Sequence, residues 1–346
     1  MKVMTPHYYK DFRCIAGACT DTCCAGWDVD VDKNSYKYYK TVKGAFGKRL
    51  KSVMVPSQDG ECTFTLKEGG RCPFLNDDNL CDLYIELGED KLCETCAEFP
   101  RFINDYGNIR EIGIAPSCKT AGELMFSYKD ELTFDTVEDN SLTLEPNDID
   151  AYTYMHLRQA RIVAFGIISD RDISIFERLM LYLDYAKRIQ KHLDAEKDEL
   201  IAGVAKRFCG ADYREELLDK LKSRDEKLHG KRLIKGLRHF FDDFKGMEVI
   251  NPDWNIHVAR VRQFLDGLAD DSGLAAVMKT YHAGSEAFAH EYEQLAMYYV
   301  YRYMLDAVND YDILLKAKNA VIGILSVDIM AAANQASGQI LQCALI

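Results

Sequence analysis

Ten of the twelve cysteines in this chain lie before residue 120, and this concentration constrains the fold more than any other feature. The opening segment, Met1 to Asp11, carries charges and a proline where an export signal would need an unbroken apolar stretch. We therefore expect a cytoplasmic protein whose thiols stay reduced and form no disulfide framework. Metal binding then becomes the leading role for the cysteines.

Two groups of cysteines stand close together in the sequence, and one more cysteine follows them. The first group places four thiols within eleven positions, with small residues between them: Cys14, Cys19, Cys23 and Cys24. The second group ends in a Cys-x-x-Cys pair, a turn that directs two thiolates at one metal: Cys72, Cys81, Cys93 and Cys96. Together with Cys118 they predict a thiolate-bound metal centre, and zinc and an iron–sulfur cluster both suit such a donor set.

Two details of this region limit which residues bind the metal. Cys23 and Cys24 point in different directions along most backbones, so one can bind a metal while the other packs, bridges a second metal atom or reacts. His7 is the only histidine in the region, and no second metal-type ligand lies close to it in the sequence. We therefore expect His7 at the surface rather than on a metal.

The predicted fold class is mainly α, with an irregular cysteine-rich N-terminal part of short helices and strands and an all-helical C-terminal part. In the first part, residues 35–53 suit a helix, and residues 62–66 and 109–114 suit short strands. In the second part, the helical spacing of apolar residues recurs at 173–189, 200–208, 217–228, 233–244, 258–268, 285–308 and 313–333.

A connector separates these two parts. Between Lys129 and Asp150 the sequence has eight acidic residues against one lysine, which is typical of a linker with at most one edge strand. Asn147 or Asp148 is the expected cap of the helix that follows. The sequence therefore predicts a cysteine-rich metal-binding domain over 1–128, an acidic connector over 129–150 and a helical domain over 151–346.

The overall charge excludes some classes of partner. A formal net charge of -12 argues against nucleic acid, whose binding depends on clustered Lys and Arg. The acidic surplus favours a lysine-bearing partner or simply keeps the protein in solution. The most apolar tract, residues 320–346, contains Asp328 and several amide side chains, so it suits a buried helix better than a membrane span.

Several motifs stand in one order along the chain. They are Cys19-x3-Cys23-Cys24-x2-Trp27 followed by Val29-Asp30-Val31-Asp32, then Arg71-Cys72-Pro73-Phe74-Leu75, Leu80-Cys81, Cys96-x2-Phe99-Pro100-Arg101 and Cys118, and an aromatic block from Tyr292 to Ile324. With these motifs the chain resembles the flagellin lysine-N-methylase family and the wider group of zinc- or iron-chelating cysteine-cluster domains. The resemblance covers nearly the whole chain.

The resemblance implies an activity, cofactors and a ligand set. It implies methylation of lysine side chains on flagellin, with S-adenosylmethionine as donor and a cysteine-bound iron–sulfur centre, expected to be a four-iron four-sulfur cluster with zinc as the alternative. The implied metal residues are Cys19, Cys23, Cys24, Cys72, Cys81, Cys96 and Cys118, with Cys14, Cys62 and Cys93 less secure. One departure is Cys118-Lys119-Thr120, where relatives usually continue as Cys-Pro-Glu.

The residues themselves support a metal more directly than methyl transfer. The chain has no strand followed by a glycine-rich turn of the Rossmann type, and Gly26 stands where a Cys-x3-Cys-x2-Cys radical motif would need its third cysteine. A non-catalytic metal-binding or metal-delivery protein is therefore the alternative. Three kinds of residue could serve a substrate: the acids Asp28, Asp30, Asp32, Glu94 and Glu98, Arg101, and the tyrosines from Tyr298 to Tyr303. A solvated surface suits each acid better, a helix-end ion pair suits Arg101 equally well, and an aromatic helix face is more often part of the core.

Overall fold

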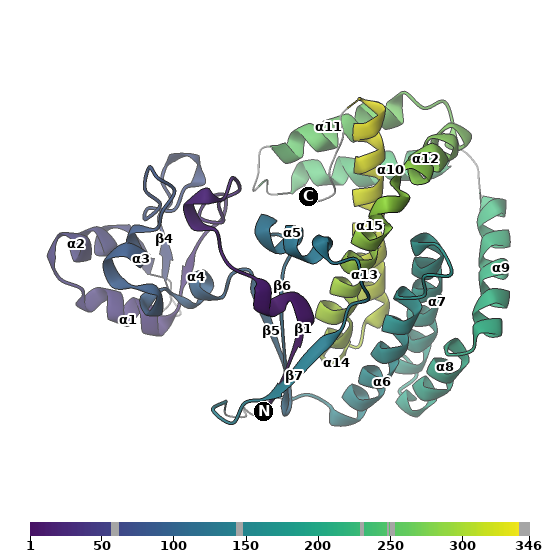
Figure 1. Cartoon of the computed structure of the whole chain (residues 1–346), viewed down its shortest axis with the longest axis horizontal. Coiled ribbons are helices and arrows are strands. Elements are labelled where there is room, and N and C mark those ends of the chain that lie inside the picture. Colours follow the sequence, from purple (N-terminus) through teal and green to yellow (C-terminus); the bar gives the residue numbers. More distant parts are fainter. Residues whose placement is uncertain (57–61, 143–147, 229–231, 248, 250–252, 339–346) are drawn as a thin grey trace.

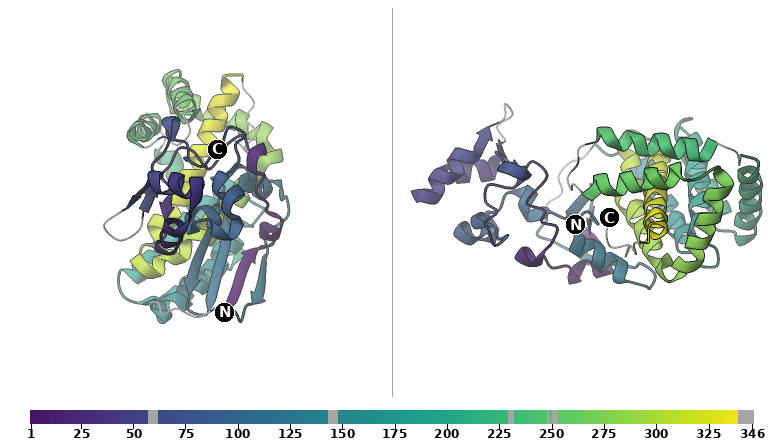
Figure 2. Two further views of the ribbon diagram at one scale, coloured as in Figure 1. Left: turned by 90° about the vertical axis from the view of Figure 1, so that its left-hand side faces the viewer. Right: turned by 90° about the horizontal axis from the view of Figure 1, so that it is seen from above.

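The computed structural model describes residues 1–56, 62–142, 148–228, 232–247, 249 and 253–338 (Figure 1). A cysteine-rich unit lies at one end of the molecule, a small sheet lies in the middle, and helices fill the other end. The view from above shows the same order (Figure 2, right). We call the described residues between 13 and 100 the cysteine lobe.

The middle of the molecule is a four-stranded sheet in the order β5-β6-β1-β7. Its strands are β1 (Lys2–Pro6), β5 (Arg101–Tyr106), β6 (Ile109–Ile114) and β7 (Phe134–Glu138). β1 runs parallel to β6 and antiparallel to β7, so the first residues of the chain lie beside the acidic connector. The strand predicted at 109–114 is confirmed, and the single edge strand allowed within the connector is β7.

The cysteine lobe consists of a small sheet and four short helices. The sheet has the order β2-β4-β3, with β2 (Asp30–Val31), β3 (Met54–Pro56) and β4 (Cys62–Phe64). The helices are α1 (Lys33–Thr41), α2 (Gly44–Val53), α3 (Asp82–Leu87) and α4 (Glu94–Glu98). The prediction of one helix over 35–53 was wrong in one respect, because the backbone is extended at Val42 and Lys43 and divides that stretch in two.

Every element that the structure describes after residue 150 is helical, as predicted. The α-helices outside the lobe are α5 (Lys119–Ser127), α6 (Ala151–Ile168), α7 (Ile175–Leu193), α8 (Ile201–Phe208), α9 (Ala211–Leu228), α10 (Arg232–Asp243), α11 (Asp253–Asp266), α12 (Asp271–Ser285), α13 (Ala289–Tyr303), α14 (Ala307–Asp310) and α15 (Ile313–Ala336). Short 3-10 turns are η1 (His7–Asp11), η2 (Ala16–Ala18), η3 (Glu68–Gly70), η4 (Glu89–Lys91), η5 (Asp198–Leu200), η6 (Phe244–Gly246), η7 (Glu286–Phe288) and η8 (Met304–Asp306).

The start of α6 differs from the prediction. Its cap is Asp150, whose carboxylate accepts hydrogen bonds from the backbone N–H groups of Tyr152 and Thr153 at 2.9 and 3.4 Å. Asp148 does not cap the helix, because it lies outside the first turn, and Asn147 lies outside the described residues. A capping carboxylate satisfies donors that the first helical turn leaves open, and it belongs directly before the helix.

The buried apolar residues form three cores. The main core joins the sheet, α5 and the helices α6–α8, α13 and α15, and it includes Tyr8, Phe102, Ile114 and Leu157. The lobe core lies within residues 29–96 and contains three cysteines, and a third core joins α10, α11, α12 and the end of α15. The division into 1–128, 129–150 and 151–346 stays a prediction, but the main core draws on residues from both sides of the connector.

The apolar C-terminal tract forms a packed helix as far as it is described. In α15, the Asp328 carboxylate is buried and lies 3.0 and 3.1 Å from the Nε2 atom of His282 in α12. Among the described residues, no helix combines the length and apolarity that a bilayer crossing requires. The buried-helix prediction is therefore confirmed for residues 320–336.

Candidate metal centre

Residues 24–26, at the end of the first cysteine group, pair with residues 70–72, at the start of the second group. The backbone N–H of Cys72 donates to the carbonyl of Cys24 at 2.8 Å, and the N–H of Gly26 donates to the carbonyl of Gly70 at 3.0 Å. Both glycines have a positive φ, 90° and 69°, a conformation that other residues adopt only with strain. This short ladder holds Cys24 beside Cys72, although 47 intervening residues separate them in the sequence.

Arginine and asparagine side chains fix the turn that carries Cys72 and Cys81. The Arg49 guanidinium donates to the carbonyl of Pro73 and to the Asp82 carboxylate, both at 2.6 Å. Asn76 also donates to Asp82, at 3.0 Å. Sequence reasoning missed Arg49, because its partners lie more than twenty positions away and no local pattern marks it. The turn is therefore positioned by contacts with α2 as well as by its own backbone.

Cys93 and Cys96 lie at the start of α4, where an aspartate positions them. Asp32 accepts hydrogen bonds from Asn34 and Ser35 at the start of α1, and its other oxygen accepts from the backbone N–H of Glu94 at 3.1 Å. One carboxylate thus joins the starts of two helices. Asp32 is one of the acids near the cysteines that the sequence offered for substrate, and in the structure its oxygens serve the backbone.

The remaining cysteines lie where the loop 14–23 meets the start of α5. Cys118 directly precedes α5, and the next side chain, Lys119, donates to the Thr20 hydroxyl at 2.9 Å and lies 3.6 Å from the Asp21 carboxylate. The residues that replace the usual Cys-Pro-Glu sequence therefore connect α5 to the cysteine loop. Trp27 covers this side, because its indole N–H donates to the Cys23 carbonyl at 2.7 Å and its ring lies 5.7 Å from that of Phe99.

Backbone amides surround several of the sulfur atoms. The Cys72 thiol accepts from the N–H groups of Phe74 and Leu75, and equivalent pairs of amides serve Cys81 and Cys118. Burial raises the pKa of all three thiols, to about 11 for Cys72, while these hydrogen bonds lower it. Without metal the three thiols are therefore protonated at neutral pH, and a bound metal would have to displace the protons.

The thiols influence the pKa of one another most strongly within the pairs Cys23–Cys24 and Cys93–Cys96, and more weakly over longer range. We call Cys24, Cys72, Cys81 and Cys96 the inner set, and Cys14, Cys19, Cys23 and Cys118 the outer set. Within the inner set, Cys24 raises the pKa of each of its three partners, although burial or a neighbouring thiol contributes more. Within the outer set, burial raises the pKa of Cys118 most, and Cys19 and Cys14 add to it. Both sets therefore consist of thiols within electrostatic reach of one another.

Adjacent residues Cys23 and Cys24 connect the two sets and are not equivalent. The Cys23 thiol donates a hydrogen bond to Cys24, which lowers the pKa of Cys24 to about 7, with a further contribution from Arg71. The same hydrogen bond, together with burial, raises the pKa of Cys23. Cys24 is half-buried against the lobe core, whereas Cys23 is exposed. The two side chains therefore differ in exposure, while the division of metal roles between them stays a prediction.

The cysteines are chemically suited to bind a metal as thiolates, but the sulfur atoms of the described cysteines do not converge on one point. In the part of the chain that the structure describes, no three Cys, His, Asp or Glu side chains are close enough together to hold a metal ion. However, eleven described cysteines are free thiols, and backbone amides point at several of them. Amide hydrogen bonds to sulfur stabilise metal-bound thiolates, so the residues present fit a zinc or iron–sulfur centre.

Arg101, which the sequence offered for substrate, and His7, which it weighed as a metal ligand, both have structural contacts. Arg101 donates to the Tyr9 hydroxyl at 3.1 Å and to the carbonyl of Ala97 at 3.5 Å, near the end of α4. His7 lies within 3.2 Å of the Thr133 carbonyl, apart from the lobe core. The helix-end role weighed for Arg101 therefore has support, though its partners are neutral.

The aromatic block of α13 belongs mostly to the main core. Tyr298 and Tyr301 are buried, and the Tyr301 hydroxyl donates to the carbonyl of Met4 at 2.8 Å. The Arg302 guanidinium lies 4.9 Å from the ring centres of both Phe102 and Tyr303, so a cation of the chain itself occupies this aromatic cluster. The core role considered for these tyrosines is confirmed for Tyr298 and Tyr301.

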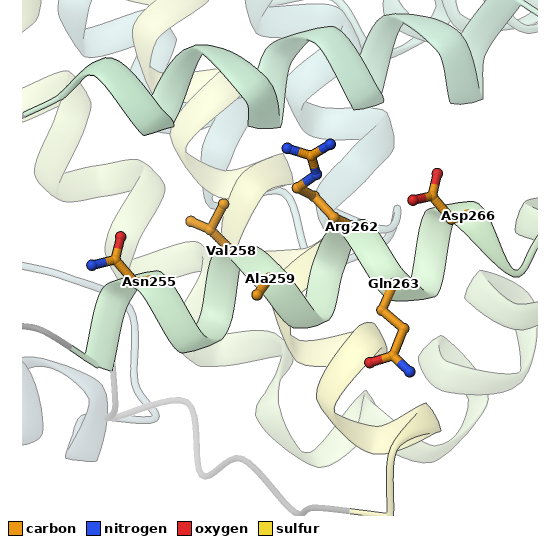
Figure 3. Close-up of a pocket in the computed structure, with 6 residues that line it drawn as sticks. All are labelled: Asn255, Val258, Ala259, Arg262, Gln263 and Asp266. Atoms are coloured by element: carbon orange, nitrogen blue, oxygen red, sulfur yellow. The ribbon is translucent and has the colours of Figure 1, made fainter.

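One hollow of the structure lies away from the cysteines, on α11. It has a volume of about 540 Å³ and lies along one face of α11. The charged residues that line it are Arg262 and Asp266. All six labelled side chains project from this single helix (Figure 3). A site for a small molecule usually surrounds its ligand on several sides, so this open face does not identify a donor site.

Comparisons with known proteins agree with this architecture. Residues 161–342, more than half of the chain, match the model of the FliB lysine N-methylase C-terminal domain. The flagellar biosynthetic protein FliU of Salmonella muenchen is 30% identical over 121 residues, which is 34% of this chain and 72% of FliU. Lysine-N-methylases of Salmonella choleraesuis and Salmonella typhimurium are each 29% identical over 121 residues, 34% of this chain and 30% of each relative.

No solved structure matches the chain. The family model covers α6 from Arg161 and the helices that follow it, and the helical part supplies most of the main core. The match therefore spans the helices against which the four-stranded sheet packs. On this evidence the chain belongs to the FliB lysine N-methylase family.

Proposed function

We propose that this protein is a cytoplasmic protein-lysine N-methyltransferase that transfers methyl groups from S-adenosylmethionine to flagellin. We further propose that it holds an iron–sulfur centre with cysteines of the lobe and Cys118. The observation that carries the proposal is the family match over 161–342. A relative named for flagellar biosynthesis and two named as lysine-N-methylases favour a flagellar substrate. The cysteine lobe adds a donor set suited to iron and sulfide.

The transfer itself has a simple atom balance. The neutral Nζ atom of a lysine attacks the methyl carbon of the donor, the carbon–sulfur bond breaks, and S-adenosylhomocysteine leaves. One proton is released to solvent or to a base, because the lysine must lose it before its nitrogen can attack. The acidic surface, with a formal net charge of -12, favours the approach of a lysine-bearing protein.

The seven cysteines with the strongest family support are the proposed metal residues. They are Cys19, Cys23, Cys24, Cys72, Cys81, Cys96 and Cys118. When bound, the metal would supply a Lewis-acidic site able to orient the donor. The chain's own part is to hold the thiolates, through the Cys24–Cys72 ladder and the Arg49 contacts, and to cover one side with Trp27.

The test is methyl transfer to flagellin by the full chain. Anaerobically purified protein is incubated with flagellin and S-adenosylmethionine carrying a labelled methyl group, and the flagellin is digested and analysed by mass spectrometry. We expect label on lysine side chains. Flagellin whose lysines have been acetylated beforehand is the substrate control, because the blocked amines cannot attack.

One result would replace this proposal with the alternative. If the protein binds metal but never labels flagellin under reducing anaerobic conditions, it is a metal-binding or metal-delivery protein. Cys96→Ser and Cys209→Ser form the matched pair for the role of the metal, since Cys96 belongs to the inner set and Cys209 is exposed at the end of α8. Label transfer by a metal-free Cys96→Ser variant would make the centre structural rather than catalytic.

A further inference from the structure

We propose that the cysteines of this chain form two metal centres, one held by the inner set and one held by the outer set. The inference deepens the metal-binding part of the proposed function and does not depend on methyl transfer. It assigns Cys24, Cys72, Cys81 and Cys96 to the first centre, and Cys14, Cys19, Cys23 and Cys118 to the second.

The inner set gathers around one side of the lobe core. Cys72 is a buried member of that core, and Cys24, Cys81 and Cys96 pack against it. Backbone contacts hold these segments together. The N–H of Cys72 donates to the Cys24 carbonyl, and Cys81 forms a β-bridge with Leu75. Four thiols from three segments of the chain therefore border one apolar volume.

The outer set lies in the loop 14–23 and at the start of α5. Cys118 packs against the main core rather than the lobe core. Lys119 ties the residues between Cys19 and Cys23 to the start of α5, through Thr20 and Asp21. Cys14 and Cys23 are exposed, in contrast to the buried Cys72. The outer set therefore lies at the joint where the lobe meets the rest of the molecule.

Stoichiometry agrees with this division. A structural zinc or a four-iron cluster takes four thiolates, so the seven cysteines with the strongest family support are too many for one such centre. Cys23 and Cys24 are neighbours with different surroundings, and one residue serves each set. Cys62 and Cys93 are buried in the lobe core and are assigned to neither centre, although the Cys93 thiol is in hydrogen-bond contact with Cys96.

The experiment counts metal and sulfide per chain after substitutions in each set. Full-length protein is purified anaerobically as wild type, Cys19→Ser, Cys118→Ser, Cys81→Ser, Cys96→Ser and, as the control outside both sets, Cys209→Ser. We expect each outer-set variant to lose one centre and keep the other, so that its metal content falls by about half when the two centres are alike. The metal-dependent absorption of the wild type should equal the sum of two contributions. One is the absorption that remains in the outer-set variants, and the other is the absorption that remains in the inner-set variants.

Two outcomes would overturn the inference. One is complete loss of metal after a single substitution in the outer set, which indicates one shared centre. The other is unchanged metal content in both Cys19→Ser and Cys118→Ser. The outer set decides the matter even if inner-set variants fold poorly, because its thiols are exposed or half-buried. Flagellin labelling by a one-centre protein would overturn only this inference, and two centres without labelling would overturn only the proposed function.

Discussion

Arg161 of α6 and Glu111 of β6 form an ion pair that is almost completely buried, with 4% and 1% of their side chains exposed. One guanidinium nitrogen donates to a Glu111 oxygen at 2.7 Å and to the Tyr301 carbonyl at 3.1 Å, and the second nitrogen donates to the other carboxylate oxygen. The pair joins the sheet to two helices of the family-matched part. The pair therefore fixes how β6 packs against α6 and α13.

Removing one partner of this pair should strongly destabilise the protein. We expect Glu111→Gln to lower the free energy of unfolding by about 3–5 kcal/mol, because it leaves a buried guanidinium without a counter-charge. Urea denaturation monitored by circular dichroism measures the change. The matched control is Asp105→Asn on the same hairpin, whose partially exposed pair with Arg110 should contribute only about 0–1 kcal/mol. Equal losses in the two variants would contradict the assignment.

Gly323 of α15 is expected to be intolerant of a side chain. A methyl group there would lie 2.5 Å from the Tyr299 hydroxyl oxygen and 2.9 Å from the neighbouring ring carbon. We expect Gly323→Ala to destabilise the protein by about 1–3 kcal/mol, because the ring must move within a packed region. Gly166→Ala in α6 is the control, since nothing lies within 4 Å of the new carbon and alanine favours the helix by about 1 kcal/mol. Thermal melts of the two variants should shift in opposite directions.

The metal content should identify the type of centre. We expect anaerobically purified protein to be brown and to contain iron and acid-labile sulfide, because the thiols outnumber those that one tetrahedral zinc can use. Elemental analysis and a sulfide assay on the same sample give the answer. Colourless protein with one zinc per chain and no sulfide would remove the iron–sulfur cluster from the proposal.

Loss of the metal should loosen the cysteine lobe before the rest of the molecule. Cys81→Ser and Cys96→Ser should lower metal content, and hydrogen exchange should then increase in β2–β4 and α1–α4 while α13 and α15 stay protected. The reason is that the lobe core is small and includes several of the thiols themselves. Cys209→Ser should change neither quantity. Cys343, the other cysteine outside the cluster, lies outside the described residues.

The acidic connector should be the first site of proteolysis. Residues 129–150 have few apolar anchors, but β7 within them pairs with β1 over five residues, from Phe134 to Glu138. We therefore expect limited digestion to cut between 139 and 150 and to spare β7. Mass spectrometry of the fragments locates the cut. Full protection of this stretch, with cleavage elsewhere, would show that the two parts behave as one domain.

The sequence predicted most of the helical part because periodic apolar residues need only a local pattern. The spacing at 313–333, for example, appears in the structure as α15, Ile313–Ala336. It did not predict α12, whose face includes few large apolar residues beyond Leu274. It also gave no sign that β1 would pair with β6 and β7, because such pairing joins residues more than a hundred positions apart.

The sequence proposed the residues of the candidate site but not their arrangement. The cysteine spacing nominated the donors, which stay a prediction, while the packing of Cys118 against the main core and of Cys24, Cys72, Cys81 and Cys96 in the lobe core comes from the structure. Cys118 shows the difference, since it is nearest in sequence to Cys96 among the metal candidates but lies with the loop 14–23 through Lys119, Thr20 and Asp21. A contact between Lys119 and a loop 99 positions earlier has no signature in the local sequence.

The cysteine lobe leaves the sheet region after Phe12 and returns to it at Arg101, whose guanidinium lies 5.5 Å from the Phe12 ring. In topological terms the lobe is an insertion whose two ends lie close together. Without it, Phe12 and Arg101 would still lie near each other and the sheet could still form. We therefore expect the proposed metal to be loaded after the sheet and the helices have folded. An apo form that waits for its metal would keep its family-specific helices folded.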